Sequence, residues 1–226
     1  MSSPKLEVET AQMLIARRGA PLLAAQYIEQ GELVVFPTDT VYGIGTTPYH
    51  AGAIDRLYEA KERPTDKGIP VLIADMHHLD RVAAGGWQAM PHYARRLAEA
   101  FWPGSLTLIL PKSPALAQNI SDNDNVAVRL IDHDLSRAMI RAAGGAVAAT
   151  SANLSAKPPA RTAAEAMLAF RGKVALILDG GLSPQKVAST IIDCTGPRPR
   201  LLRRGPIELE ALEQAAGLAI DGGEVT

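Results

Sequence analysis

Cationic side chains gather in the segment "YEAKERPTDKG", residues 58–68, where they could bind phosphate groups. Lys61, Arg63 and Lys67 lie around the end of a predicted helix, which Pro64 terminates. The helix dipole favours cations at a helix C-terminus, so this placement can be purely structural. An arginine fork beside two movable lysine charges also forms a phosphate clamp. Composition alone does not separate the two interpretations.

The segment "FPTDTVYGIG", residues 36–45, runs from an apolar strand into hydrogen-bonding side chains, among them Thr38, Thr40 and Tyr42. Such a segment is either a polar turn or the rim of a small-molecule site. We expect the two glycines at its end to let the backbone turn close to a ligand. These are Gly43 and Gly45.

A second strand-like run ends in the same way, in "ATSANLSAKPPAR" at residues 149–161. Thr150, Ser151 and Asn153 follow directly after small apolar residues. Small side chains let a ligand approach the backbone, and hydroxyls and amides supply hydrogen bonds. Considered in isolation, Ser-Ala-Asn is more often a turn that caps the next helix.

Further polar residues interrupt or open later strands. Arg129 lies inside "VAVRLID" and must face solvent or find a partner, because burying it alone is costly. Ser189 opens "STIID", and either Arg203 or Arg204 in "LLRRGPI" could reach a phosphate. Ligands of open α/β sheets commonly bind beyond strand ends, so these clusters predict one shared site. The set lacks an obvious nucleophile or histidine base, and suits binding two polar substrates better than covalent catalysis.

Composition narrows the classes of function. The chain has 226 residues, of which 47% are hydrophobic and 21% charged, as is typical of globular proteins. It has no run of 18 apolar residues, no basic-then-apolar N-terminus and one cysteine, Cys194, so we expect a cytoplasmic protein without internal disulfides. The net charge of −1 argues against coating nucleic acid, although residues 198–204 hold four arginines. Because nucleotide-loop, esterase and zinc-site motifs are absent, we expect no metal held by the protein itself.

The elements that must position these residues alternate between strands and helices. This alternation predicts an α/β fold with a mixed sheet in one domain. Helices are predicted at residues 10–30, 51–62, 76–83, 91–101, 135–144, 162–170 and 208–216. Strands are predicted at residues 32–38, 70–75, 105–111, 125–131, 146–153, 174–181, 188–195 and 200–207. We expect residues 221–226 to form a mobile tail.

The order of the motifs resembles one known family. "FPTDTVYGIG", "AKERPTDKGIPVLIAD", "FWPGSLTLIL", "VAVRLID", "ATSANLSAKPP" and "STIID" occur in the order found in the YrdC/TsaC family. The resemblance covers about residues 10–207 and is to the short, single-domain form. It implies a YrdC-like α/β fold, in which helices flank a twisted mixed β-sheet around a deep, positively lined cleft. It also implies a catalytic domain at residues 10–207, then a C-terminal helix and mobile tail at 208–226.

Members of this family are threonylcarbamoyl-AMP synthases, so the resemblance implies a nucleotidyltransferase. Its substrates would be L-threonine, bicarbonate or CO2, and ATP, with Mg2+ carried by the nucleotide and pyrophosphate released. A tRNA threonylcarbamoyl-transferase complex would then use the product for the t6A37 modification of ANN-decoding tRNAs. Two alternatives stay open. One is an RNA-binding module that contacts tRNA or double-stranded RNA, for which an aromatic content of 4% is thin. The other is a related carbamoyl-adenylate-forming domain.

The resemblance also implies a role for each matched residue. Catalytic roles fall on Lys61 and Arg63. Threonine-side roles fall on Thr38, Thr40, Arg129, Ala149 and Ser189. ATP-side roles fall on Arg63, Lys67, Asn125, Ser151, Asn153 and Arg203. The chain departs from the family pattern at Ala74, where many relatives have a histidine, and at "RRGP", which leaves Arg203 and Arg204 as alternatives for one position.

Overall fold

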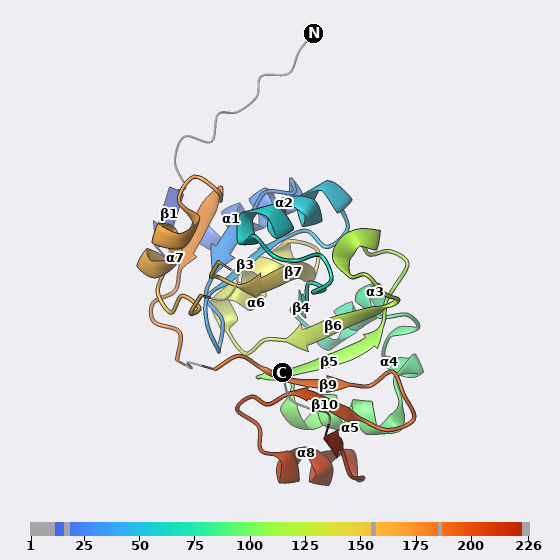
Figure 1. The fold of residues 1–226 in the computed structure, drawn as a ribbon. Coiled ribbons are helices and arrows are strands. Elements are labelled where there is room, and N and C mark those ends of the chain that lie inside the picture. The colour runs from blue at the N-terminus through green and yellow to red at the C-terminus, as the bar shows by residue number, and fades with distance from the viewer. Residues whose placement is uncertain (1–11, 16–18, 155–156, 185–186, 223–226) are drawn as a thin grey trace.

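A single mixed sheet forms the centre of the computed structural model, which describes residues 12–15, 19–154, 157–184 and 187–222 (Figure 1). The sheet confirms the predicted α/β class. In spatial order its strands are β1 (Gln12–Ile15), β8 (Leu176–Asp179), β2 (Val34–Phe36), β3 (Gly43–Thr46), β7 (Ala146–Ser151), β4 (Val71–Ile73), β6 (Asn125–Leu130), β5 (Leu106–Pro111), β9 (Thr190–Asp193), β10 (Arg200–Arg203) and β11 (Asp221–Gly222).

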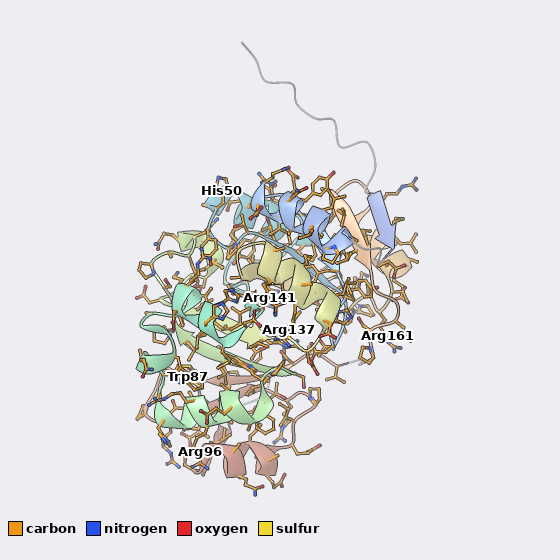
Figure 2. The ribbon with its side chains drawn as sticks, turned by 180° about the vertical axis from the view of Figure 1, so that it is seen from behind. His50, Trp87, Arg96, Arg137, Arg141 and Arg161 are labelled. Atoms are coloured by element: carbon orange, nitrogen blue, oxygen red, sulfur yellow. The ribbon has the colours of Figure 1, made fainter. Side chains whose placement is uncertain are left out.

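Helices cover the sheet on both sides. They are α1 (Ala20–Glu29), α2 (Ala51–Lys61), α3 (Leu79–Val82), α4 (Gly86–Ala89), α5 (His92–Phe101), α6 (Asp134–Ala142), α7 (Ala163–Phe170) and α8 (Leu209–Ala216), with short 3-10 turns at Met76–His78 and Gln118–Ile120. Seen from behind, α6 lies across the sheet and carries the labelled Arg137 and Arg141 (Figure 2).

Alternation along the strands divides the core into two layers. In β2, Val34 and Phe36 join a cluster with α1 and α6, whereas Val35 between them joins the larger cluster on the other face. All three side chains are fully buried. Successive side chains of a strand point to opposite faces, so a continuous apolar run fits a strand that is covered on both sides.

The half of the sheet made of β6, β5, β9 and β10 is covered differently. Leu106 and Leu108 of β5 and Val126 and Val128 of β6 are buried in the large cluster. This cluster also includes Leu212 of α8, which packs beside α5 (Figure 1). The alternate residues of these strands face the opposite side, where the candidate site lies.

The predicted helix at 10–30 is wrong at its start. Residues 12–15 form β1, parallel to β8, and the helix begins only at Ala20; residues 10, 11 and 16–18 lie outside the described part. Gly19 adopts a φ of 99°, a left-handed conformation that interrupts a helix, and Pro21 sits in the first turn, where its missing N–H costs nothing.

Strand β3 and helix α4 were not predicted, and the C-terminal prediction needs a correction as well. Gly43 and Gly45, expected in a turn, lie in β3 between β2 and β7. A Cβ atom on Gly45 would lie 2.6 Å from the carbonyl oxygen of Ala148, so this glycine allows close strand packing. Of the predicted mobile tail at residues 221–226, Asp221 and Gly222 pair with β10 as a short strand, and residues 223–226 lie outside the described part.

Candidate functional site

A cleft of about 500 Å3 lies on the face of the sheet that α5 and α8 leave uncovered. Its floor consists of alternate residues of four strands, including Asn125, Ala127 and Arg129 of β6 and Thr107 of β5. We expected a site beyond strand ends. The structure instead places it mainly across the face of β6, β5, β9 and β10. Strand ends contribute at the β2–β3 connection, at the end of β7, and just before β4 and β9.

Thr38 and Thr40 form one wall of the cleft, and both are buried. Their hydroxyl oxygens lie 3.0 Å apart, and the Thr38 hydroxyl donates to the carbonyl oxygen of Val41 at 2.6 Å. The Thr40 backbone N–H also donates to the Thr38 hydroxyl oxygen. These bonds are those of a tight polar turn, so the turn and the cleft wall are the same structure.

Arg129 reaches this wall from the strand floor. Its Nη1 donates to the Thr40 hydroxyl at 3.1 Å, and its Nε donates to the carbonyl oxygen of Gly104 at 2.8 Å. Its Nη2 lies 2.6 Å from a carboxylate oxygen of Asp39. Burial lowers the pKa of Arg129, and the Asp39 carboxylate opposes that shift. The buried cation therefore has a fixed orientation and a partner of opposite charge.

A second polar network joins β5, the residue before β9, and β10 across the floor. The Thr107 and Ser189 hydroxyl oxygens lie 2.7 Å apart, and both residues are buried. Arg203 donates through Nη2 to the Ser189 hydroxyl oxygen at 3.1 Å and through Nε to the Ser189 carbonyl oxygen at 2.9 Å. Arg203 lines the cleft, whereas Arg204 is exposed outside its lining. Of these two alternatives, only Arg203 is thus positioned at the site.

Lys61 is placed differently from what the sequence suggested. It is only 2% exposed and is not part of the cleft lining. Its ammonium donates to the carbonyl oxygens of Ser151 and Asn153 and to the Asn153 side-chain oxygen at 3.2 Å. Burial, and next the charge of Arg63, lower its pKa to about 8. Lys61 therefore ties the end of α2 to the segment that follows β7.

The residue between Lys61 and Arg63 has an unusual backbone. Glu62 has a φ of 51°, and among the described residues it is the one non-glycine with a positive φ. It ends α2, with the Arg63 N–H bonded to the carbonyl oxygen of Tyr58. This left-handed turn at a helix end is normally made by glycine. The turn directs the neighbouring Lys61 and Arg63 to different surroundings.

Arg63 lines the cleft, and backbone carbonyls hold its guanidinium. Nε donates to Lys67 at 2.7 Å and Nη2 to Gly68 at 2.9 Å. Burial lowers its pKa, and the nearby Tyr58 and Asp66 oppose this shift. Lys67 contributes its carbonyl oxygen to this arrangement, while the residue itself is exposed and outside the cleft lining.

The remaining predicted residues divide into two groups. Ala149 and Ser151 of β7 and Asn125 of β6 line the cleft. Asn153 does not line it; its side-chain nitrogen donates to the carbonyl oxygens of Leu154 and Lys157, and its side-chain oxygen accepts from Ser151 at 2.5 Å. Asn153 thus shapes the loop behind Ser151.

The charge of the lining is mixed rather than uniformly positive. Its charged members are Arg63, Arg129, Arg200 and Arg203, with Asp66, Asp122 and Asp193. The arginines still act on one another: burial lowers the pKa of Arg203, and the charges of Arg129 and Arg63 lower it further. Several guanidiniums therefore converge on one space, which suits a polyanion such as a triphosphate.

Sequence reasoning missed Asp39, Thr107, Arg200 and Asp193 as members of this site. Arg200 and Asp193 form an ion pair of 3.0 Å at the cleft. Thr107 carried a detectable signal, because it is a polar residue inside an apolar alternation. Asp39 pairs with a residue 90 positions away, and no local pattern reveals such a contact.

A group of possible metal ligands lies on the rear side of the described structure, formed by Asp75, His77 and His78. The Asp75 carboxylate already accepts hydrogen bonds from Arg137 and Arg141, two residues labelled near each other in Figure 2. Hydrogen bonding from Arg141, above all, lowers the Asp75 pKa to about 2. These guanidiniums make the group a poor site for a cation.

The chain is similar to known proteins in both its sequence and its fold. The Sua5/YciO/YrdC family model, described as telomere recombination, matches residues 26–205. The chain belongs to the Sua5/YciO/YrdC family. The cleft, its threonine wall and its arginines all lie within the matched range.

Two members of this family are named threonylcarbamoyl-AMP synthase. The protein from Pyrococcus abyssi is 41% identical, with 86% of this chain and 56% of that protein aligned, and the one from Bacillus subtilis is 40% identical, with 88% and 58% aligned. The chain thus spans a little over half the length of these relatives. The crystal structure of P. abyssi Sua5 complexed with L-threonine superposes with a TM-score of 0.88 at 38% identity, over 94% of this chain and 63% of that one.

Within the described residues, no helix of this family member has both the length and the apolar character needed to cross a membrane.

Proposed function

We propose that this chain is a threonylcarbamoyl-AMP synthase. The observation that carries the proposal is a single cleft in which a threonine wall, a fixed arginine and several converging guanidiniums face one space. The identity of about two fifths to proteins of that name supports the same activity. The substrates are L-threonine, bicarbonate or CO2, and ATP, and the reaction is an adenylyl transfer that releases pyrophosphate.

The two substrates occupy different parts of the cleft. L-threonine lies against Thr38 and Thr40, with its carboxylate near Arg129 and its remaining contacts to Ala149 and Ser189. The relative bound to L-threonine supports an amino-acid site in this fold. Thr38, Thr40 and Arg129 form one connected hydrogen-bond network. A site that bonds the threonine hydroxyl rejects valine, because polar groups would be left unpaired.

ATP lies on the side lined by Arg63, Asn125, Ser151 and Arg203. Arg63 and Arg203 face the phosphates. Backbone carbonyls at Lys67, Gly68 and Ser189 hold their side chains in place. Lys61 acts from behind by holding the backbone at Ser151 and Asn153, which keeps Ser151 at the cleft. We propose that exposed Lys67 contacts ATP only through movement of its long side chain.

The chemistry then requires positioning more than a reactive side chain. The threonine amine attacks CO2 and loses a proton to give an N-carboxylate. One oxygen of this carboxylate attacks the α-phosphorus of ATP, the bond to the β-phosphate oxygen breaks, and pyrophosphate leaves. Holding both reactants in line can lower the barrier by about 7–11 kcal/mol in ideal cases. Preorganised guanidiniums stabilise the charge that builds on the phosphates.

Mg2+ is proposed to enter with the nucleotide. The cleft offers Asp66 and Asp122 as separate carboxylates in its lining. Mg2+ usually keeps several waters and is held by substrate phosphates with one or two carboxylates, so this donor set fits a metal carried by ATP. Bound there, it would neutralise phosphate charge.

The product is proposed to serve the t6A37 modification of ANN-decoding tRNAs through a separate threonylcarbamoyl-transferase complex in the cytoplasm. Residues 10–207 are proposed as the catalytic domain, and the C-terminal segment from residue 208 supports it, since α8 packs against α5. An RNA-binding module and a domain that forms other carbamoyl-adenylates are the alternatives.

The decisive experiment measures pyrophosphate release with and without L-threonine and bicarbonate. Release that requires ATP, L-threonine and bicarbonate together supports the proposal. Equal release with serine, or without any amino acid, contradicts the substrate assignment. Salt-dependent tRNA binding without turnover would favour the RNA-binding alternative. Arg63→Ala should nearly abolish release while the fold stays intact. Lys61→Ala should also lower release, because it frees the backbone at Ser151 and Asn153.

A further inference from the structure

Thr107 has no role in the function proposed above, yet it lies on the floor of the cleft. It lies on β5 opposite Ile191 of β9, is 3% exposed and lines the cleft. Its hydroxyl oxygen is 2.7 Å from that of Ser189, which also accepts from Nη2 of Arg203 at 3.1 Å. A residue of β5, a residue of β10 and the residue that precedes β9 therefore meet at the Ser189 hydroxyl.

The number of protons in this network limits what it can bind. Each hydroxyl has one proton to donate and two lone pairs to accept. Thr107 and Ser189 share one hydrogen bond, which uses one of their two protons. Within the described residues, neither hydroxyl has another acceptor. One O–H is therefore left to donate into the cleft.

Arg203 uses part of the acceptor capacity of Ser189, whichever of the two hydroxyls donates to the other. Its guanidinium has no lone pair to offer, so it always occupies one acceptor position of Ser189. When Thr107 donates to the second acceptor position, the Ser189 oxygen is saturated and its proton must point away from both partners. Accepting from a cation also polarises the Ser189 O–H and makes it a better donor.

We propose that Thr107 is a positioning residue that makes Ser189 a donor-only group, selective for an anionic oxygen of the substrate. The inference rests on the proposed function and refines the same site. The surroundings agree with it, because Arg203 lies in the field of Arg129 and Arg63. An anionic oxygen comes either from the threonine carboxylate or from an ATP phosphate, and separate binding measurements distinguish the two sources.

The test compares four variants: Thr107→Val, Thr107→Ser, Ser189→Ala and the double variant Thr107→Val/Ser189→Ala. Calorimetry measures the Kd of L-threonine, L-threoninamide and ATP, each alone, and thermal melting checks the fold. Valine keeps the shape of threonine and removes the hydroxyl, and serine keeps the hydroxyl. L-Threoninamide replaces the anionic carboxylate with an amide that both donates and accepts.

We expect Ser189→Ala to weaken binding of one anionic ligand by about tenfold, which corresponds to about 1.4 kcal/mol for a hydrogen bond to a charged group. Thr107→Val should weaken the same ligand severalfold, Thr107→Ser should bind within about twofold of the natural protein, and the double variant should bind no worse than Ser189→Ala. If the ligand is L-threonine, Thr107→Val should also reduce the ratio of the Kd of L-threoninamide to the Kd of L-threonine. A loss confined to ATP assigns the donor to a phosphate.

The proposal is overturned if folded Thr107→Val binds both L-threonine and ATP within about twofold of the natural protein, or if the losses from the two single variants add fully in the double variant. These results are separate from a failure of the proposed function. If the proposed function were wrong, the natural protein itself would not release pyrophosphate in response to L-threonine. The coupling between Thr107 and Ser189 can be measured from binding in either case.

Discussion

Removing the Asp39 carboxylate should destabilise the protein and loosen its amino-acid site together. Asp39 lies 2.6 Å from Nη2 of Arg129, and the side chains are 12% and 7% exposed. Asp39→Ala leaves a buried guanidinium without its counter-charge. Breaking a buried pair in this way costs about 3–5 kcal/mol. Arg129 keeps its bonds to Gly104 and Thr40, so we expect about 3 kcal/mol.

For a chain of this length, that loss corresponds to a fall in Tm of about 6–12 °C. Asp39→Asn retains an oxygen acceptor without the charge and should lie between Asp39→Ala and the natural protein. A matched control is Lys173→Met, which removes the more exposed Lys173–Glu62 pair of 3.2 Å. Such a surface pair contributes about 0–1 kcal/mol.

The assay combines thermal melting with calorimetric binding of L-threonine. Because Asp39 fixes the guanidinium that faces Thr40, Asp39→Ala should weaken L-threonine binding more than ATP binding. A Tm within 2 °C of the Lys173→Met control, with unchanged L-threonine affinity, would refute the conclusion that Asp39 holds Arg129 in place.

Three further outcomes follow from the geometry. The pKa of Lys61 in the folded protein is about 8, below its ordinary value of 10.5, so folding favours its neutral form. The free energy of unfolding, measured in urea, should therefore rise between about pH 8 and 10.5, and this rise should be absent in Lys61→Met. Pyrophosphate release should fall above pH 8, because the Lys61 ammonium is lost. Glu62→Gly should raise stability by about 1 kcal/mol, because glycine accepts the left-handed turn without the penalty of an L side chain; an unchanged or lower urea midpoint would contradict this. Gly45→Ala should cost about 1–3 kcal/mol, since its Cβ would meet Ala148 at 2.6 Å; a Tm equal to that of the natural protein would show that β3 has more room than the structure indicates.

The sequence predicted the class of fold because apolar runs and helical periods are local properties. It failed where a local pattern fits two structures. Residues 12–15 continue an apolar period into α1, but Gly19 breaks the helix and β8 offers a partner strand. The glycines of "YGIG" suggested a turn, and their pairing with β2 and β7 depends on contacts far apart in the chain.

The sequence predicted which types of residue form the site better than it predicted which atoms those residues contact. Arg63, Arg129 and Arg203 reach the cleft as expected, because charged side chains on otherwise apolar elements need a polar destination. Lys61 was expected to face phosphate and instead bonds the backbone behind β7. A lysine at a helix end has long reach in several directions, and in the folded chain its ammonium meets the carbonyl oxygens of Ser151 and Asn153.

The position of the cleft follows from a feature of the sequence that strand prediction alone does not use. In β5 and β6, the residues facing α5 and α8 are leucine and valine, while the alternate positions include Thr107, Asn125, Ala127 and Arg129. A sheet face covered by a helix would have apolar residues there as well. Polar and small residues at most of these alternate positions, beside the apolar Ile109, therefore mark a face kept open for ligand. In this fold the same alternation that builds the core also selects the floor of the site, which explains why Thr107 and Arg129 lie on the same face as Ser189 without being close to it in sequence.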